Sequence, residues 1–258
     1  MNIERMVLIM KKSIKKKYEK CGIRLENEDC LKFLKTIQSE SVDLVLIDPP
    51  YQISQPVNYH CGGNPKFHSV NYNFGEWDYN FTIMKQVIQE CYRVLRQGGT
   101  IICFYDLWKL TELKEYLLES KFRQMRFIEW IKRNPVPTNC SKNYLTTARE
   151  IAVTAVKGTN PTFNSRYDKG IYEYGICQGK VRFHTTQKPV ELIAELVRKH
   201  SNEGELVLDC FSGSGSTAMA CIKENRCFVG CELDKDYYTK SVARIDTVLS
   251  MDKVKAVA

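Results

Sequence analysis

Short apolar runs alternate with amphipathic helical patterns along most of the chain. Runs rich in Val, Ile, Leu and Phe are typical of buried strands, and they occur at residues 42–48, 100–105, 126–132, 151–156, 206–210 and 227–232. Apolar positions three or four residues apart predict helices at residues 82–96, 107–120, 189–200, 217–225 and 236–249. This alternation predicts an α/β fold built on a doubly wound, mostly parallel sheet.

Two stretches interrupt the alternation. Residues 52–79 mix Gly, Asn, Tyr and His, and residues 158–183 mix Gly, Arg and Tyr. Both are long for connections within a compact domain, so we expect functional loops, with residues 158–183 forming a small recognition insert. At this length the whole chain, residues 1–258, fits a single domain with such an insert.

The first predicted strand ends in the polar sequence Asp48-Pro49-Pro50-Tyr51. Neither proline donates a backbone hydrogen bond, and each restricts the residue before it to extended geometry, so this turn is stiff and its carbonyls lack local partners. Open α/β sheets bind ligands at the carboxyl ends of their strands, where a carboxylate, free carbonyls and an aromatic ring form a plausible site. A simple capping turn with a chance tyrosine is the alternative interpretation.

A second pattern lies near the end of the chain, in the sequence LVLDCFSGSGSTAMACIKENRCFVGCELD. A strand ends at Asp209, a turn with Gly213 and Gly215 follows, and the next strand ends at Glu232, which is 23 residues beyond Asp209. This spacing is typical of a nucleotide-binding βαβ unit, in which the helix amino terminus and a distant acid contact the ligand. Because the third glycine of a dinucleotide fingerprint is absent, a smaller adenosine-bearing ligand is favoured over a dinucleotide; a structural glycine turn is the alternative.

The net charge of +8 is concentrated in one part of the chain. Residues 121–188 contain 13 Lys or Arg against 4 Asp or Glu, whereas the remainder contains 25 against 26. A basic segment beside a nearly neutral core is typical of a polyanion-binding surface, because cations that neutralise phosphates release counterions. An idle solvated surface would show the same composition.

Cysteines, histidines and the longest apolar runs exclude several classes of protein. The eleven cysteines include no CxxC pair and the four histidines are dispersed, so we expect reduced thiols and no metal site. The apolar runs are too short to span a membrane, and the basic cluster near the start follows the apolar patch instead of preceding it, unlike a signal peptide. A cytoplasmic protein is expected.

The motifs DPPY, HTTQKP and DCFSGSGST occur in this order, with NEDCLKFL, WIKRNPVPTN and TTAREIAVTAVKG between or before them. Together they resemble the β-class of S-adenosylmethionine-dependent DNA amino-methyltransferases, in which the catalytic half precedes the cofactor half. The resemblance covers nearly the whole chain and implies a single methyltransferase domain of the Rossmann-like kind. It implies site-specific methyl transfer from S-adenosylmethionine to the exocyclic N6 amine of adenine in DNA, after base flipping, as part of a restriction-modification system.

The resemblance also implies roles for individual residues. The catalytic residues would be Asp48, Pro49, Pro50 and Tyr51. Asp48 and the Pro49 carbonyl would accept hydrogen bonds from the base amine, the prolines would hold that carbonyl in place, and Tyr51 would stack on the flipped base. The cofactor would meet Asp29, Cys30, Lys188, Pro189, Asp209, Phe211, Gly213, Ser214, Gly215, Thr217 and Glu232. Asp29 is equally suited to be the N-cap of a helix over CLKFLK. DNA would meet residues 52–79 and the cations Arg166, Lys169, Lys180 and Arg182.

The substrate and the assembly have alternatives. Cytosine-N4 is the other amine that the family methylates, although members that act on cytosine often carry Ser in place of Asp48. An inactive nucleic-acid-binding module with this fold is a further alternative. The DNA partner is double-stranded or single-stranded, and because residues 158–183 are short for a recognition domain, a brief target site or the help of a second subunit in a homodimer is expected.

Overall fold

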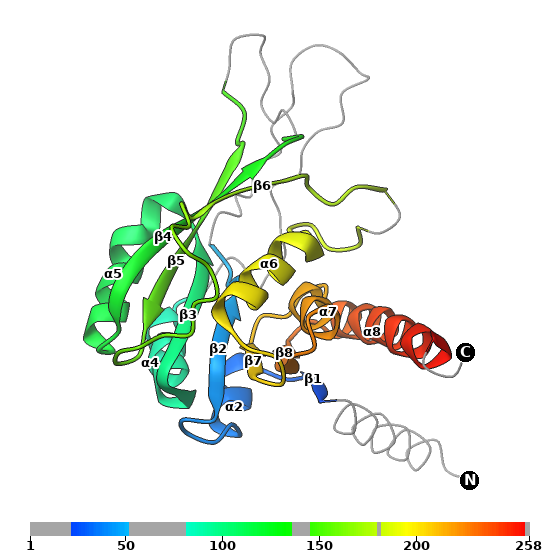
Figure 1. Cartoon of the computed structure of the whole chain (residues 1–258), viewed down its shortest axis with the longest axis horizontal. Coiled ribbons are helices and arrows are strands. Elements are labelled where there is room, and N and C mark those ends of the chain that lie inside the picture. The colour runs from blue at the N-terminus through cyan, green and yellow to red at the C-terminus, as the bar shows by residue number, and fades with distance from the viewer. Residues whose placement is uncertain (1–21, 52–80, 136–144, 180–181, 256–258) are drawn as a thin grey trace.

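The computed structural model describes residues 22–51, 81–135, 145–179 and 182–255. In this part of the chain a single twisted sheet runs through the molecule (Figure 1), with strand order β1-β8-β7-β2-β3-β5-β4-β6. Neighbouring strands are parallel except where β5 pairs with β3 and with β4. The strands are β1 (Ile23–Asn27), β2 (Val42–Ile47), β3 (Leu95–Tyr105), β4 (Arg123–Lys132), β5 (Arg149–Val156), β6 (Ile171–Tyr174), β7 (Leu206–Asp209) and β8 (Cys227–Glu232).

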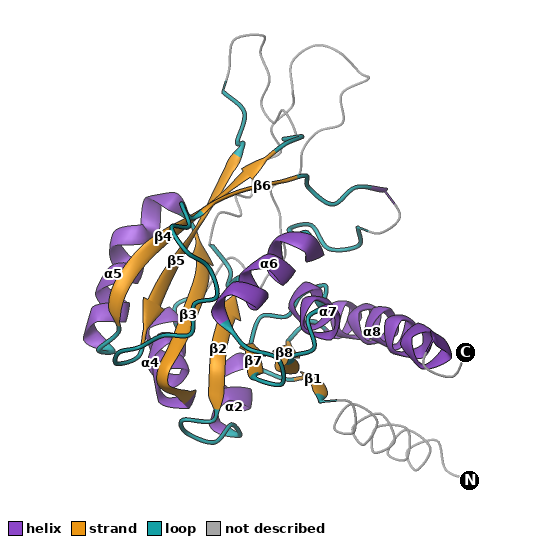
Figure 2. Ribbon diagram, in the orientation of Figure 1, coloured by secondary structure: helices purple, strands orange, loops and turns teal. Residues whose placement is uncertain are grey.

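Helices cover both faces of the sheet (Figure 2). One apolar core lies under α2 (Cys30–Lys35), α4 (Met84–Val94) and α5 (Leu110–Glu119), which follows the short 3-10 helix η1 (Leu107–Lys109). The other lies under α6 (Val190–His200), α7 (Ser216–Lys223) and α8 (Lys235–Lys255). Strand β2 contributes Val45 and Ile47 to the first core and Leu44 and Leu46 to the second. Burial on both faces explains why its sequence is continuously apolar instead of alternating.

The sheet has a topological switch point between β2 and β7. The chain leaves β2 through α4 to β3 on one side, and it leaves β7 through α7 to β8 on the other side. Because the two connections diverge, the carboxyl ends of β2 and β7 are left uncovered, which is where open α/β sheets bind ligands. The residues at these two ends are Asp48, directly after β2, and Asp209, the last residue of β7.

The predicted α/β pattern is confirmed, with differences at the ends and edges of the sheet. All six predicted strands and all five predicted helices are present, although β3 begins at Leu95, inside the range predicted as helix. Strands β1 and β6 were not predicted, because β1 alternates apolar and polar residues over only five positions and β6 lies within the predicted insert. Both are edge strands, where burial on one face leaves a weak pattern.

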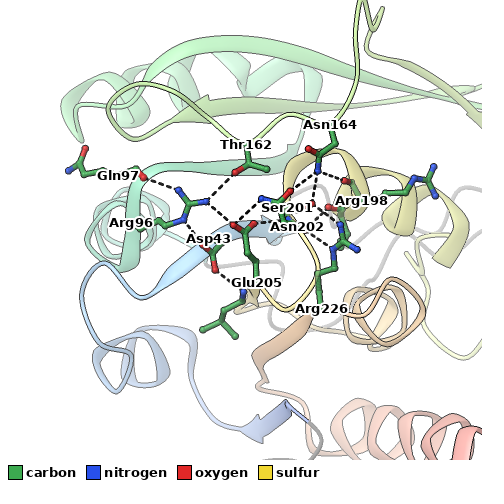
Figure 3. Close-up of polar contacts among 12 residues, drawn as sticks. Asp43, Arg96, Gln97, Thr162, Asn164, Arg198, Ser201, Asn202, Glu205 and Arg226 are labelled. Atoms are coloured by element: carbon green, nitrogen blue, oxygen red, sulfur yellow. Dashed lines mark hydrogen bonds and ion pairs between the residues drawn. The ribbon is translucent and has the colours of Figure 1, made fainter. Parts of the chain in front are cut away.

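A polar network ties the amino ends of three strands together (Figure 3). Arg96 at the start of β3 forms ion pairs with Asp43 of β2 and with Glu205, the residue before β7. It also donates to Thr162 Oγ1 over 3.1 Å, while Asn164 donates to the carbonyls of the last turn of α6 and of the residue after the helix. These contacts fix the first part of the predicted insert at the end of the sheet opposite to the switch point.

None of the helices in the described ranges is both long enough and apolar enough to cross a membrane.

Candidate active site

A pocket of about 310 Å³ opens at the switch point. It brings together most of the residues that the sequence singled out, including the DPPY turn after β2 and the glycine turn after β7. The predicted residues that line it are Asp29, Cys30, Asp48, Pro49, Pro50, Tyr51, Lys188, Asp209, Phe211, Gly213, Ser214, Thr217 and Glu232. Two predicted residues, Pro189 and Gly215, lie directly beside this lining, as the N-caps of α6 and α7.

The Asp48 carboxylate is held from two sides. Tyr51 donates its hydroxyl hydrogen to Asp48 Oδ1 over 2.6 Å, and Lys188 Nζ forms an ion pair with Asp48 Oδ2. The Tyr51 ring stands edge-on to Tyr105, with ring centroids 6.1 Å apart, and its backbone carbonyl accepts a hydrogen bond from Lys109 Nζ over 3.0 Å. Burial raises the pKa of Asp48 above its ordinary value, against the opposing effect of the Lys188 cation. The carboxylate therefore has a fixed orientation and lone pairs that remain free to accept hydrogen bonds.

Hydrogen bonds to the Asp209 side chain hold the loop between β7 and α7 in place. Asp209 accepts hydrogen bonds from the Phe211 amide over 3.0 Å and from the Thr217 hydroxyl over 2.6 Å, which joins the end of the strand to the first turn of α7. Because Asp209 is 3% exposed, burial raises its pKa to about 7, although both hydrogen bonds oppose this shift. The backbone of Gly213 has a φ of 49°, in the left-handed region that favours glycine.

Glu232, at the end of β8, orients this turn from the far side. Its Oε2 accepts a hydrogen bond from the Gly213 amide over 2.7 Å, and its Oε1 accepts one from the Asp234 amide over 2.8 Å. Burial raises its pKa above the ordinary value. Two hydrogen bonds use only part of a carboxylate's accepting capacity, so Glu232 can accept further hydrogen bonds from a ligand in the pocket.

Asp29 has the capping role that its position in the sequence allowed. Its carboxylate accepts a hydrogen bond from the Lys32 amide over 3.0 Å at the start of α2, and the residue also lines the pocket. Its neighbour Cys30 is buried, and burial together with the Asp29 charge raises the pKa of the thiol to about 12. Capping is thus confirmed, and contact between Asp29 and a ligand stays a prediction.

The side chain of Lys188 points toward the DPPY turn. Its Nζ contacts Asp48 and lies 3.0 Å from Glu150 Oε2, and the side chain is 6% exposed. Its backbone carbonyl accepts a hydrogen bond from Ser216 Oγ over 2.8 Å, at the amino end of α7. The sequence predicted that Lys188 closes the carboxylate end of a cofactor, and this contact stays a prediction; in the structure the ammonium group contacts Asp48 and Glu150, and the backbone carbonyl contacts Ser216.

Several lining residues were not predicted from the sequence. His184 packs on Tyr237 with ring centroids 4.2 Å apart, and Phe81 stands edge-on to Phe211 at 5.5 Å. Burial lowers the pKa of His184 to about 4, so this ring is neutral at pH 7. The position of His184 in HTTQKP was a signal that could have found it, whereas Phe81 and Tyr237 lie outside every quoted motif. The remaining unpredicted lining residues are Glu28, Leu46, Ile83, Phe104, Thr186, Gln187, Ile193, Cys210, Ser212, Ser216 and Leu233.

The predicted DNA-binding cations lie at two different ends of α6. Arg182 donates to the backbone carbonyls of His184 and Thr185, close to the pocket. Arg166 and Lys169 are exposed and flank Asp168, which forms an ion pair of 2.6 Å with Lys199 in the last turn of α6. Arg166 and Lys169 therefore lie close to the last turn of α6, whereas Arg182 lies before its first turn. Lys180 and residues 52–79 lie outside the described residues.

Within the described ranges, no group of three or more His, Cys, Asp or Glu side chains is placed to hold a metal ion. The residues that line the pocket suit an adenosine-bearing ligand and not a metal ion. A side chain at Gly213 would reach the His184 ring, with the added carbon 3.3 Å from Nε2, so the glycine keeps the turn open for close approach. The carboxylates of Asp29 and Glu232 are among the lining residues and can accept hydrogen bonds from hydroxyl and amino groups.

A switch-point pocket with an acid at each of the three strand ends β2, β7 and β8 defines a class of α/β enzymes that bind a nucleoside-containing cofactor. The family model described as DNA methylase (N6_N4_Mtase) matches residues 42–243, and the chain belongs to this family of DNA methyltransferases. This assignment agrees with the resemblance to DNA methyltransferases that the DPPY and FSGSG motifs, in this order, indicated in the sequence.

Individual relatives support the family. The type II methyltransferase M2.MboI of Moraxella bovis is 28% identical over 239 residues, which cover 84% of this chain and 85% of the relative. Type II methyltransferase M2.DpnII of Streptococcus pneumoniae is 27% identical, covering 89% of this chain and 91% of that protein. The crystal structure of the M1.HpyAVI-SAM complex has a TM-score of 0.67 and 25% identity, covering 86% of this chain and 99% of its own. PvuII DNA methyltransferase, titled cytosine-N4-specific, has a TM-score of 0.64 at 16% identity, over 85% of this chain and 86% of its own, which shows the shared fold alone.

Proposed function

We propose that this DNA methyltransferase transfers a methyl group from S-adenosylmethionine to the N6 amine of an adenine that has been flipped out of DNA. The observation that carries the proposal is the Asp48 carboxylate, which is held by Tyr51 and Lys188 in the same pocket as the glycine turn. An enzyme that flips its target needs a pocket for one base beside its cofactor site, with an aromatic ring on which the base can stack. Tyr51 supplies that ring.

The target amine needs help from the protein because its lone pair is delocalised into the base. If Asp48 and the Pro49 carbonyl each accept one amine hydrogen, the nitrogen becomes more tetrahedral and its lone pair points toward the methyl donor. Asp48 can do so while bonded to Tyr51 and Lys188, because a carboxylate has about four accepting sites. Asp48 or water then takes the proton that the amine loses, and no covalent intermediate with the enzyme is required.

S-adenosylmethionine supplies an electrophilic methyl group on a sulfonium. Glu232 would accept hydrogen bonds from its ribose hydroxyls, and Asp29 with Cys30 would contact its adenine. The methionine part would lie along the turn that Asp209 and Thr217 close, which involves Phe211, Gly213, Ser214 and Gly215, with Pro189 at the neighbouring helix end. Titration calorimetry with S-adenosylmethionine tests the alternative of an inactive nucleic-acid-binding module.

Adenine is the proposed base because Asp48 stands where family members that act on cytosine often carry Ser. The partner is DNA, contacted at the pocket end of the sheet by Arg182 and by the loops beside it. A homodimer would supply recognition surface that residues 158–183 are too few to provide. The protein would act in the cytoplasm, as one half of a restriction-modification pair.

Mass spectrometry of the nucleosides from methylated DNA tests the reaction directly. We expect N6-methyladenine after incubation of DNA with the protein and S-adenosylmethionine. The Asp48→Ala variant should lose methylation while its cofactor Kd stays within several-fold, because Asp48 is proposed to touch the base amine and not the cofactor. Detection of N4-methylcytosine alone would overturn the choice of base.

Asp106→Ala is a matched control, since Asp106 also follows a strand of the sheet but caps η1 and lies outside the pocket lining. It should lose about 1 kcal/mol of stability through the missing cap and keep methylation. Loss of both cofactor binding and methylation in Asp48→Ala would mean that Asp48 is structural.

A further inference from the structure

We infer that Lys188 and Glu150 are positioning residues that set the charge and orientation of the Asp48 carboxylate, so that together they determine the pH range in which methyl transfer occurs. The inference rests on the proposed function, because it concerns the carboxylate that binds the base amine. It assigns a role to Glu150, which lies in the sequence TTAREIAVTAVKG but received no role from it, and it adds to Lys188 a role for the side chain beyond the predicted cofactor contact.

Four charged side chains of alternating sign form a row that starts at the pocket lining with Asp48 and Lys188 and continues into the sheet with Glu150 and Lys132. Asp48 follows β2, Lys188 precedes α6, and Glu150 and Lys132 lie on β5 and β4. Lys188 Nζ joins Asp48 to Glu150 Oε2, which is 3.0 Å away, and Lys132 Nζ lies 2.8 Å from Glu150 Oε1. Because four separate elements supply the row, the position of the carboxylate depends on the packing of the whole sheet.

Burial strengthens the electrostatic attraction between the charges in this row. The Lys188 side chain is 6% exposed and its Nζ lies 5.1 Å from the centroid of the Phe104 ring. Opposite charges attract more strongly in such a setting than in water, and a single buried charge without a partner is costly. Lys188 needs both carboxylates, and each carboxylate is held in place by the shared ammonium group.

The pKa directions agree with this geometry. Burial alone would lower the pKa of Lys188, but Asp48 and Glu150 outweigh burial and raise it, so Lys188 stays charged and is unsuited to accept the proton from the base. Burial raises the pKa of Asp48, Lys188 lowers it, and Glu150 raises it. The two positioning residues therefore act on Asp48 in opposite directions.

Other titratable groups face Asp48 from the remaining elements. Tyr51 donates to it, and Cys103 of β3 and Asp209 of β7 interact with it electrostatically. Burial raises the pKa of Tyr51 and of Cys103 far enough that both are neutral at pH 7. Asp209 titrates near pH 7, so cofactor saturation must be verified at each pH.

The experiment is the single-turnover methylation rate against pH, with DNA and S-adenosylmethionine saturating, for wild type, Lys188→Met and Glu150→Gln. The amine needs an ionised Asp48, so the rate falls as pH drops through the pKa of Asp48. Lys188→Met removes the cation, which should move this acid limb to higher pH by about 1 to 3 pH units. Glu150→Gln removes an anion and should move the limb to lower pH.

Lys199→Met is the matched control, because Lys199 also lies between two carboxylates, 2.6 Å from Asp168 and 2.6 Å from Glu195, at the far end of α6. Its pH profile should coincide with that of wild type. Unshifted acid limbs in Lys188→Met and Glu150→Gln, or shifts in the same direction, would overturn the inference. If Lys188→Met does not fold, the shift of Glu150→Gln decides it alone. A wild-type protein that methylates no base would instead refute the proposed function.

Discussion

Asp209 occupies an unusual environment for an acid. It is buried at the end of β7, where no cation of the described residues forms an ion pair with it and its hydrogen-bond partners among those residues are the Phe211 amide and the Thr217 hydroxyl. Burial raises the pKa of Asp209 from 3.8 to about 7, so the folded protein binds a proton more tightly than the unfolded chain. The stabilisation that this proton provides is complete below about pH 4 and is lost as pH rises through about 7.

Replacement of Asp209 by Asn should therefore reduce the loss of stability between pH 5 and pH 8. An Asn side chain can accept from the Phe211 amide with its oxygen and donate to Thr217 Oγ1 with its nitrogen, so both hydrogen bonds are retained. Urea unfolding at the two pH values should show that the free energy of unfolding falls less in Asp209→Asn than in wild type, by about 2 to 3 kcal/mol.

Asp168→Asn provides a comparison with the opposite sign. Hydrogen bonds from Lys199 and from the Gly170 amide outweigh burial and lower the pKa of Asp168, so its stabilisation is present at neutral pH and lost in acid. The two histidines with lowered pKa, His184 and His200, titrate alike in wild type and Asp209→Asn, so they cancel in that comparison, whereas Asp168→Asn also removes the charge that raises the pKa of His200. Identical pH dependence in wild type and Asp209→Asn would show that Asp209 is ionised in the folded protein.

The turn between β7 and α7 depends on a glycine whose conformation and surroundings both matter. Gly213 has a φ of 49°, its amide donates to Glu232, and a side chain there would reach His184. Gly204, in the turn before β7, has a φ of 78°, but among the described residues other than its chain neighbours no atom lies within 4 Å of where its side chain would be. Substitutions at the two glycines therefore distinguish the loss of stability caused by backbone strain from the loss of ligand affinity caused by a side chain in the pocket.

Gly213→Ala and Gly204→Ala should each lower the free energy of unfolding by about 1 to 2 kcal/mol, because both place a side chain in the left-handed region. Only Gly213→Ala should also weaken S-adenosylmethionine binding, by about tenfold or more, which corresponds to about 1.4 kcal/mol. Calorimetric titration and thermal unfolding measure the two effects. Equal cofactor affinity in both variants would contradict the assignment of this turn to the cofactor.

Among the described residues, the predicted DNA-binding cations lie near opposite ends of α6. Arg182 lies beside His184, before the first turn of α6, whereas Arg166 and Lys169 lie next to Asp168, which pairs with Lys199 in the last turn of α6 (Figure 1 shows the course of this helix). A flipped base must enter the pocket, so the duplex lies over the pocket end. Cations at the two ends should therefore differ in their contribution to DNA binding.

Arg182→Ala should lower the slope of log affinity against log salt concentration by about 1, the value expected for loss of one phosphate contact. Arg166→Ala should change this slope less, because the neighbouring residues Asn164 and Asp168 contact the carboxyl end of α6, whereas Arg182 precedes its amino end. DNA binding measured over a series of salt concentrations separates the two variants. A larger effect at Arg166, or a relaxed target site in Arg166→Ala, would mean that DNA extends over this end and that Arg166 reads bases.

Local patterns were sufficient for the strands and helices of the interior. Strand β2 is apolar at nearly every position because both of its faces are buried. The turn after β7 contains glycine at position 213 because only glycine readily adopts the left-handed backbone found there. The resemblance of DPPY and FSGSG to a methyltransferase family likewise depended on sequence alone, and the family match confirms it. These features are determined within a few neighbouring residues.

Strand order, by contrast, is a long-range property. The sequence does not state that β7 inserts beside β2, yet this pairing places Asp48 and Asp209, 161 positions apart, in one pocket. Nor could it reveal that Lys188 binds Asp48 and Glu150 at once, because the ion pairs join residues from three elements whose arrangement depends on packing. Similarly, residues 158–170 appeared to belong to one basic insert, and only the structure shows that Asn164 and Asp168 within it contact the carboxyl end of α6. Composition and periodicity predict which face of an element is buried. Which other element packs against that face depends on the free energy of the whole fold.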